Sequence, residues 1–245
     1  MLCTLDSLRR LQLGATDGDI GLVRDVLFDD KDWAVRYLAA IAGQWMFGKR
    51  VLIGVEALGR PALHTLTLPV AMRIQDVREQ PEVDEVPVTR LREVALRQHH
   101  GWPAYWGKAL AEEGIPAIPE GDGRTLTTGP EAQAVLGMDP TAQAAVLFSV
   151  RELEGFAVAD RDGAFGTLAD AAIDVDGWTI AYWIIDTPAA GRRTLVSPQW
   201  TAGVDRVGRM VRLNLDRART TQAPAADVGQ DGLLRAAPQG IQPPA

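Results

Sequence analysis

The stretch DGDIG at residues 17–21 reveals how the chain is organised, because a related stretch, DGAFG, returns at residues 162–166. The offset of 145 residues holds without a gap from Asp17 to Tyr37, and seven of those 21 pairs are identical. Composition alone would give roughly one or two identities. A period of this length is far longer than a solenoid repeat, so the chain contains two copies of one domain. The identical pairs are Asp17/Asp162, Gly18/Gly163, Gly21/Gly166, Asp25/Asp170, Asp29/Asp174, Trp33/Trp178 and Tyr37/Tyr182.

Outside this block the alignment continues with small gaps. Upstream, Ser7-Leu8 aligns with Ser149-Val150. Downstream, the basic-then-apolar stretch GKRVLI at 48–53 aligns with GRRTLV at 191–196. The two copies therefore extend well beyond the 21 residues that define them.

Inside each copy, apolar residues alternate with a spacing of two, which is the pattern of half-buried strands. The alternation covers residues 33–41 and 66–74 in the first copy and residues 178–184 and 211–215 in the second. Asp-Gly pairs suit the tight turns between strands, since glycine accepts a positive φ without a Cβ clash. Short strands joined by turns predict a mainly all-β fold of two small antiparallel β-barrels, whose closure removes exposed edges.

The segments around the repeats have a different composition. An acidic, proline-bounded linker precedes an amphipathic helix expected from about residue 89 to residue 100, which Gly101 and Pro103 end. Residues 108–140 are expected to form a loop or a partly ordered segment. The expected domains are a first barrel at 1–81, a helical and loop connector at 82–144, a second barrel at 145–222 and a disordered tail at 223–245.

Both copies resemble the PRC-barrel domain, a family named for the cytoplasmic part of the H subunit of the photosynthetic reaction centre. The resembling residues are the Asp-Gly-x-x-Gly turns with their downstream aspartates, the strands at 35–38 and 180–183, and the basic-then-apolar strands. The segment from Arg90 to Gly107 is similar to the connecting region of bacterial tandem PRC-barrel proteins. Two positions depart from the pattern: Gly54 stands where many members have proline, and Arg36 has Ala181 as its counterpart.

The resemblance implies a non-enzymatic protein-binding or assembly module, similar to the H-subunit domain that caps the reaction centre. The alternative that it implies is a ribosome or RNA-processing accessory, because the ribosome maturation factor carries such a barrel at its C-terminus. That factor has another barrel in front, and residues 1–12 are too few to supply one. The identity of the bound protein stays open at this point.

Composition limits the partners. The chain has 25 Lys and Arg against 32 Asp and Glu, and the resulting charge of −7 argues against DNA and makes RNA the weaker choice. Its single cysteine, Cys3, cannot form an intramolecular disulfide. The longest apolar stretch, Tyr37 to Phe47, is shorter than the ~20 residues of a membrane-spanning helix. Asp6 interrupts the apolar run that a signal peptide would need, so we expect a cytoplasmic protein.

Several residues that could carry chemistry are better explained by turns and helix ends. Residues 174–177 begin like a calcium loop, but Ile185 stands where an EF-hand needs glutamate. Asp25 and Asp29 are interpreted as solvated or turn-bonded carboxylates, with paired acid-base chemistry as the alternative. The adjacent pair His99-His100 suits a helix C-terminus better than a metal. We therefore expect no catalytic residue, no metal site and no cofactor.

Trp102, Tyr105 and Trp106 are the candidate partner-binding residues. Aromatic side chains are enriched in binding hot spots, because each buries much area at little rotamer cost. In the alternative interpretation they fold back onto a barrel and clamp the connecting helix, and a homodimer contact is a further use. The basic pairs Lys49-Arg50 and Arg192-Arg193 are interpreted as solvated edge charges, with contact to an anionic membrane surface as the alternative.

Overall fold

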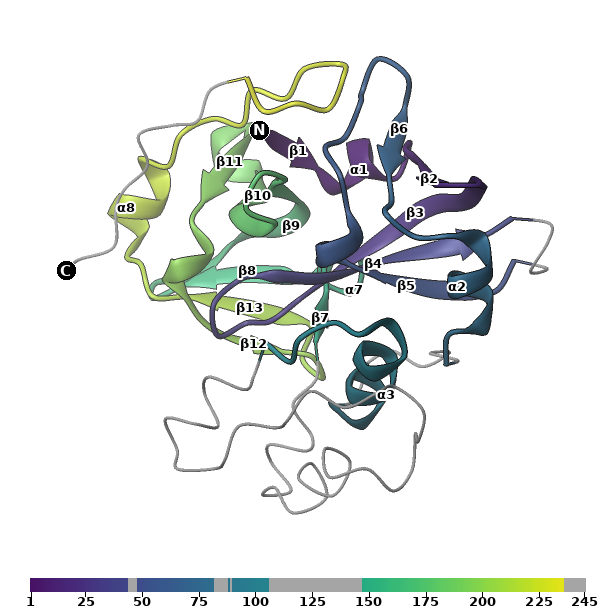
Figure 1. Ribbon diagram of the computed structural model, residues 1–245. Coiled ribbons are helices and arrows are strands. Elements are labelled where there is room, and N and C mark those ends of the chain that lie inside the picture. The colour runs from purple at the N-terminus through teal and green to yellow at the C-terminus, as the bar shows by residue number, and fades with distance from the viewer. Residues whose placement is uncertain (44–47, 82–87, 89, 106–146, 236–245) are drawn as a thin grey trace.

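A computed structural model describes residues 1–43, 48–81, 88, 90–105 and 147–235, and its structure is mainly β (Figure 1). Two curled sheets form half-barrels, one from each copy of the repeat. The mainly β class predicted from the alternating residues is thereby confirmed. Within the described residues, none of the helices has the length and apolar character needed to cross a bilayer. We call residues 1–105 the first half and residues 147–235 the second half.

The strand orders of the two sheets correspond: β5-β4-β3-β2-β6 in the first half and β11-β10-β9-β8-β13-β12 in the second. The first half comprises β1 (Leu2–Thr4), α1 (Leu5–Leu8), β2 (Gln12–Ala15), β3 (Gly18–Phe28), β4 (Val35–Ala42), β5 (Arg50–Gly54), a 3-10 helix (Val55–Ala57), β6 (Thr67–Pro69), α2 (Ile74–Glu79) and α3 (Arg90–His100). The second half comprises β7 (Phe148–Ser149), α7 (Val150–Leu153), β8 (Ala157–Asp160), β9 (Gly163–Asp174), β10 (Thr179–Thr187), a 3-10 helix (Pro188–Ala190), β11 (Arg192–Val196), a 3-10 helix (Pro198–Trp200), β12 (Thr201–Asp205), β13 (Met210–Leu213) and α8 (Arg217–Thr221).

The predicted connecting helix is confirmed as α3, which ends at His100 and is followed by Gly101 with a φ of +68°. The strand predicted over residues 66–74 is wrong in its second part, where α2 begins at Ile74. Pro69 has no N–H to continue the ladder, and the Ile74 N–H donates to the Asp17 carboxylate at 2.8 Å. The prediction of wholly antiparallel sheets is also wrong, because β6 runs parallel to β2 and β13 runs parallel to β8.

The two halves exchange their first strands. Strand β1 pairs with β9 of the second half, and β7 pairs with β3 of the first half. The registers correspond residue for residue, since Thr4 faces Ala172 and Ser149 faces Leu27. Thr4 is therefore the counterpart of Ser149, which corrects the upstream alignment of Ser7-Leu8 with Ser149-Val150. The exchanged strands also cross the predicted limits of the domains at 1–81 and 145–222.

A pseudo-twofold axis relates the halves. The Val35 N–H donates to the Trp178 carbonyl at 2.7 Å, and the Ile180 N–H donates to the Trp33 carbonyl at 2.8 Å. At a second point, the guanidinium of Arg9 lies 2.8 Å from the carboxylate of its own counterpart, Glu154. Contacts between positions 145 residues apart place the axis between the two sheets.

One hydrophobic cluster spans both halves. Trp183 of β10 is fully buried, and its ring centroid lies 5.6 Å from that of Phe28 and 5.8 Å from that of Trp33. Phe28 also stacks on Phe148 at 5.8 Å. The halves are therefore joined by an aromatic core, in addition to the exchanged strands.

The C-terminal segment is a correction to the predicted disordered tail. Residues 223–235 run along β11 and over β1, where Figure 1 shows them in yellow. The Ala226 N–H donates to the Arg193 carbonyl at 3.0 Å, and Leu234 is buried. Hydrogen bonds to strand edges order this segment, although its sequence lacks periodicity. Residues 236–245 and the predicted loop at 108–140 lie outside the described residues.

Candidate functional site

The predicted partner-binding residues Trp102 and Tyr105 fold back onto the first half, and Trp106 lies outside the described residues. The Trp102 ring centroid lies 4.4 Å from that of His100 and 6.5 Å from that of Tyr37. A Cβ at position 54 would lie 2.7 Å from Trp102 Cζ3, so glycine at this position makes room for the indole. A side chain larger than glycine at position 54 would therefore clash with the connector.

Tyr105 belongs to a buried polar cluster under α3. Its hydroxyl donates to Glu93 Oε1 at 2.7 Å and accepts from Arg90 Nη1 at 2.7 Å. The Arg36 guanidinium lies 3.8 Å from the centroid of the tyrosine ring. Arg36 thus contacts a connector residue that the second half lacks, which explains why its counterpart is Ala181.

Arg97 extends this cluster from α3 to the sheet. Its guanidinium donates to the Tyr37 hydroxyl at 3.1 Å, to the Pro103 carbonyl at 2.8 Å and to the Glu56 carboxylate. Each of these partners lies in a different element, so one side chain ties the helix to β4 and to the 3-10 helix after β5. Glu93 and Arg97 stand four residues apart on α3, a spacing that places side chains on one helix face. That spacing could have predicted the buried charged face, which the apolar residues of the helix alone do not indicate.

The Glu93 side chain is completely buried and forms an ion pair with Arg90 at 2.9 Å. Burial raises the pKa of Glu93 from 4.5 to about 6, although Arg90, Tyr105 and Arg97 favour the charged form. The carboxylate therefore titrates within an accessible range of pH while it holds the connector in place.

We expect the unfolding free energy to fall as the pH rises from about 4.5 to about 6, because the folded protein holds the Glu93 proton more tightly than the unfolded chain does. A shift of this size corresponds to about 2 kcal/mol. Urea unfolding of the wild type and of Glu93→Gln at several pH values measures it. The glutamine variant should lack this part of the pH dependence, and identical profiles for the two proteins would contradict the assignment.

Asp25 and Asp170, identical in the repeat, each bind the start of the helix that belongs to the other half. Asp25 accepts hydrogen bonds from the Ser149 hydroxyl at 2.6 Å and the Arg151 N–H at 3.1 Å. Asp170 accepts hydrogen bonds from the N–H groups of Leu5 at 3.0 Å and Asp6 at 3.3 Å. These carboxylates are only 5% and 6% exposed, so the expectation that Asp25 is solvated is wrong.

Two related clefts lie above these carboxylates. The first cleft has a volume of about 460 Å³ and is lined by Arg24, Asp25, Ala39, Ile41, Arg50, Ser149, Arg151 and Glu152. The second cleft has a volume of about 510 Å³, and its lining includes the counterparts Asp170, Ile184, Arg193 and Thr4 together with residues of the C-terminal segment. The repeat thus produces the same concave surface twice.

The outer sheet faces beside the clefts are covered by segments from outside the repeat. In the first half, Val88, Leu96 and Trp102 cover a cluster that includes Tyr37 and Leu52. In the second half, Ala226, Val228 and Leu234 cover the corresponding cluster, whose members include the counterparts of those two residues, Tyr182 and Leu195. A helix covers one face and an extended segment covers the other, so the two faces accept different shapes of chain.

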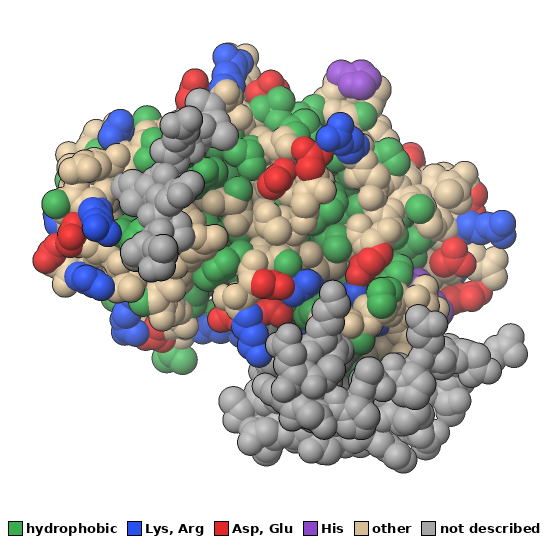
Figure 2. All heavy atoms as spheres, turned by 60° about the vertical axis from the view of Figure 1, so that its left-hand side comes forward, with side chains coloured by type: hydrophobic (Ala, Val, Ile, Leu, Met, Phe, Trp, Pro, Cys, Tyr) green, Lys and Arg blue, Asp and Glu red, His purple; other side chains and the backbone are tan. Residues whose placement is uncertain are grey.

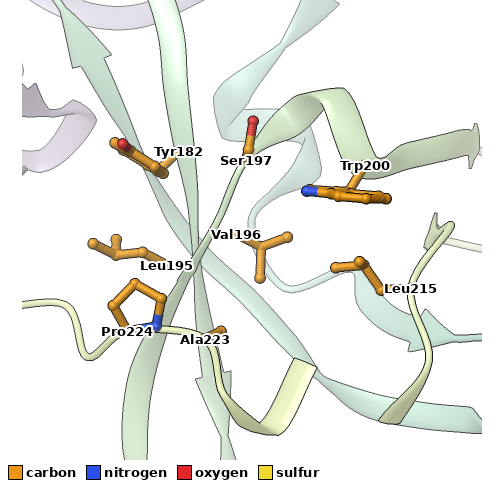
Figure 3. Close-up of a pocket in the computed structure, with 8 residues that line it drawn as sticks. All are labelled: Tyr182, Leu195, Val196, Ser197, Trp200, Leu215, Ala223 and Pro224. Atoms are coloured by element: carbon orange, nitrogen blue, oxygen red, sulfur yellow. The ribbon is translucent and has the colours of Figure 1, made fainter. Parts of the chain in front are cut away.

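A third pocket, shown in Figure 3, lies between β11, the 3-10 helix Pro198–Trp200 and the residues that follow α8. Its cavity of about 20 Å³ is close to the volume that one water molecule needs. The Trp200 indole lies over Leu215, and Ala223 and Pro224 line the opposite side (Figure 3). This pocket is mainly a packing contact of the C-terminal segment.

The remaining predicted positions have local partners. Asp29 accepts from the Lys31 N–H at 3.1 Å, whereas Asp25 binds α7, so the two carboxylates have different roles. Asp174 accepts from the Asp176 N–H at 3.2 Å, as a turn residue does. Among the described residues, no three His, Cys, Asp or Glu side chains are grouped as metal ligands.

No family model matches the chain, and no curated protein matches it. The functional conclusion therefore depends on the geometry of the repeat, the two clefts and the covered sheet faces.

Proposed function

We propose that this chain is a tandem PRC-barrel protein that works as a non-enzymatic docking or assembly module in the cytoplasm. The duplicated turns and strands that resemble the family support this proposal, as does the pseudo-twofold arrangement of the halves. The aspartates that recur in the repeat accept hydrogen bonds from backbone N–H groups, which is a structural role. Trp102 and Tyr105 contribute by fixing the connector that shapes the first half.

The observation that carries the proposal is that each half holds a segment of chain on its outer sheet face. In the second half, the extended segment 224–234 is bound through backbone hydrogen bonds to β11 and β1. Strand edges that bind an added extended segment are a common mode of protein recognition. A module built from two such faces is suited to holding other chains.

The ribosome or RNA-processing function is the alternative. Figure 2 shows one face of the molecule, on whose described part acidic and basic side chains are interspersed without a continuous basic stripe. An RNA partner needs clustered Lys and Arg to neutralise its phosphates. The appearance of this face therefore favours a protein partner.

Affinity capture with the full chain, followed by reconstitution, tests the proposed function. We expect a protein that co-elutes with the purified chain at a fixed stoichiometry after nuclease treatment. Nuclease-sensitive co-sedimentation with ribosomal particles would instead support the alternative. Failure of every captured protein to form a complex with the purified chain would contradict docking.

A further inference from the structure

The C-terminal segment lines one side of the second cleft, whereas no described residue of that segment lines the first cleft. We propose that the first cleft binds a short acidic segment of a partner protein in an extended conformation. This inference rests on the proposed docking function and specifies the chemistry of the partner.

The second cleft shows how an extended segment is held there. The Thr4 N–H donates to the Gly232 carbonyl at 3.1 Å at one edge, and the Ala226 N–H donates to the Arg193 carbonyl at 3.0 Å at the other. These bonds involve only backbone atoms, so they depend on strand geometry and not on side-chain identity. Ser149 and Arg50 stand at the corresponding edges of the first cleft.

The ends of the open stretch are set by residues of the chain itself. Beyond the β5 edge, the Gln80 side-chain amide donates to the Leu52 carbonyl and accepts from the Leu52 N–H, in the amide orientation that gives both of its polar atoms a partner. Leu52 is the counterpart of Leu195, which binds the Pro224 carbonyl in the second half. Beyond the other edge, Arg206 donates to the Leu147 carbonyl at 3.0 Å. These two contacts stand where Pro224 and Leu234 bind the strand edges in the second half.

The charges of the first cleft select an acidic occupant. Its lining contains Arg24, Arg50 and Arg151, whose counterparts are Ala169, Arg193 and Asp6. Arg24 and Arg151 are exposed, and within the described part of the chain neither guanidinium forms an ion pair.

The two acidic residues of this cleft differ in how far they are paired, since Glu152 Oε2 has no hydrogen-bond partner among the described residues. Both oxygens of Asp25 accept hydrogen bonds from α7 and its capping residue, and Glu152 pairs with Arg206 at 3.3 Å. Carboxylates on a bound segment would supply the missing partners of the arginines and form charge-assisted hydrogen bonds.

The test uses the full chain and a labelled peptide with the sequence of residues 224–235 carrying A226E and Q230E. We expect saturable one-to-one binding by fluorescence anisotropy. The double variant Arg24→Glu and Arg151→Glu should weaken binding at least tenfold. The matched control, Arg161→Glu with Arg212→Glu, makes the same change of charge at exposed arginines outside the cleft and should bind as the wild type does.

Three results would overturn the proposal. The first is equal binding by the wild type and the cleft variant. The second is equal binding of a peptide with lysine at the four acidic positions. The third is displacement by inorganic phosphate or a uridine oligonucleotide at the concentration of the peptide, which would show a site for anions in general. A partner protein that binds the wild type and the cleft variant equally would keep the docking function and exclude this cleft.

Discussion

Replacement of Asp25 by alanine is expected to lower the unfolding free energy by about 3 kcal/mol. The carboxylate accepts from the Ser149 hydroxyl and from the N–H groups of Arg151 and Val26, and the donors of Ser149 and Val26 would lose their acceptor in a buried place. A buried donor without a partner costs about 1–3 kcal/mol. Urea unfolding followed by circular dichroism measures the difference.

Two variants sharpen this experiment. Asp170→Ala should cost a similar amount, because its carboxylate binds α1 as Asp25 binds α7. Asp186→Ala removes an exposed carboxylate paired only with Arg193 among the described residues, and should change stability by less than about 0.5 kcal/mol. A loss at Asp25 no larger than that at Asp186 would show that the capping bonds do not stabilise the fold.

The repeated residues found in the sequence correspond to the contacts that define each half. Asp17 and Asp162 bind the first N–H groups of α2 and α8, at 2.8 and 2.7 Å. A Cβ at Gly21 would lie 1.9 Å from the Ile41 carbonyl oxygen, and one at Gly166 would lie 2.3 Å from that of Asp186. The repeat could therefore predict the turns and the long strands, since these contacts lie within one copy.

The exchange between the halves could not be predicted in this way. Strands β1 and β7 span three and two residues, which is too short for an alternating pattern to be recognised. Their pairing depends on the opposite half, and sequence periodicity contains no information about a partner so distant along the chain. The C-terminal segment is similar, because its order comes from backbone bonds that carry no side-chain pattern.

The candidate site was predicted in part. Packing of the aromatic connector onto the sheet is one of the three uses that the sequence suggests for it, beside partner binding and a homodimer contact. The clefts were missed because their arginines come from separate elements: Arg24 from β3, Arg50 from β5 and Arg151 from α7. Only the exchange of β7 brings the last of these beside the others.

Replacement of Trp183 by alanine is expected to lower the unfolding free energy by about 4 kcal/mol and to destabilise both halves together. The indole is fully buried, its N–H donates to Thr201 Oγ1 at 3.0 Å, and its ring contacts Phe28 and Trp33 of the first half. Since β1 and β7 are exchanged, neither half can unfold without breaking the sheet of the other. The reaction should therefore be one cooperative transition.

Hydrogen exchange read by mass spectrometry distinguishes one cooperative transition from independent unfolding of the two halves. In Trp183→Ala, peptides from β3 and β4 should lose protection to the same extent as peptides from β9 and β10, although the substitution lies in β10. Trp183→Phe keeps an aromatic ring in the shared core and should lose less stability, with the same coupling. Loss of protection confined to the second half would mean that the exchanged strands do not couple the halves, and the clefts could then not be treated as parts of one rigid module.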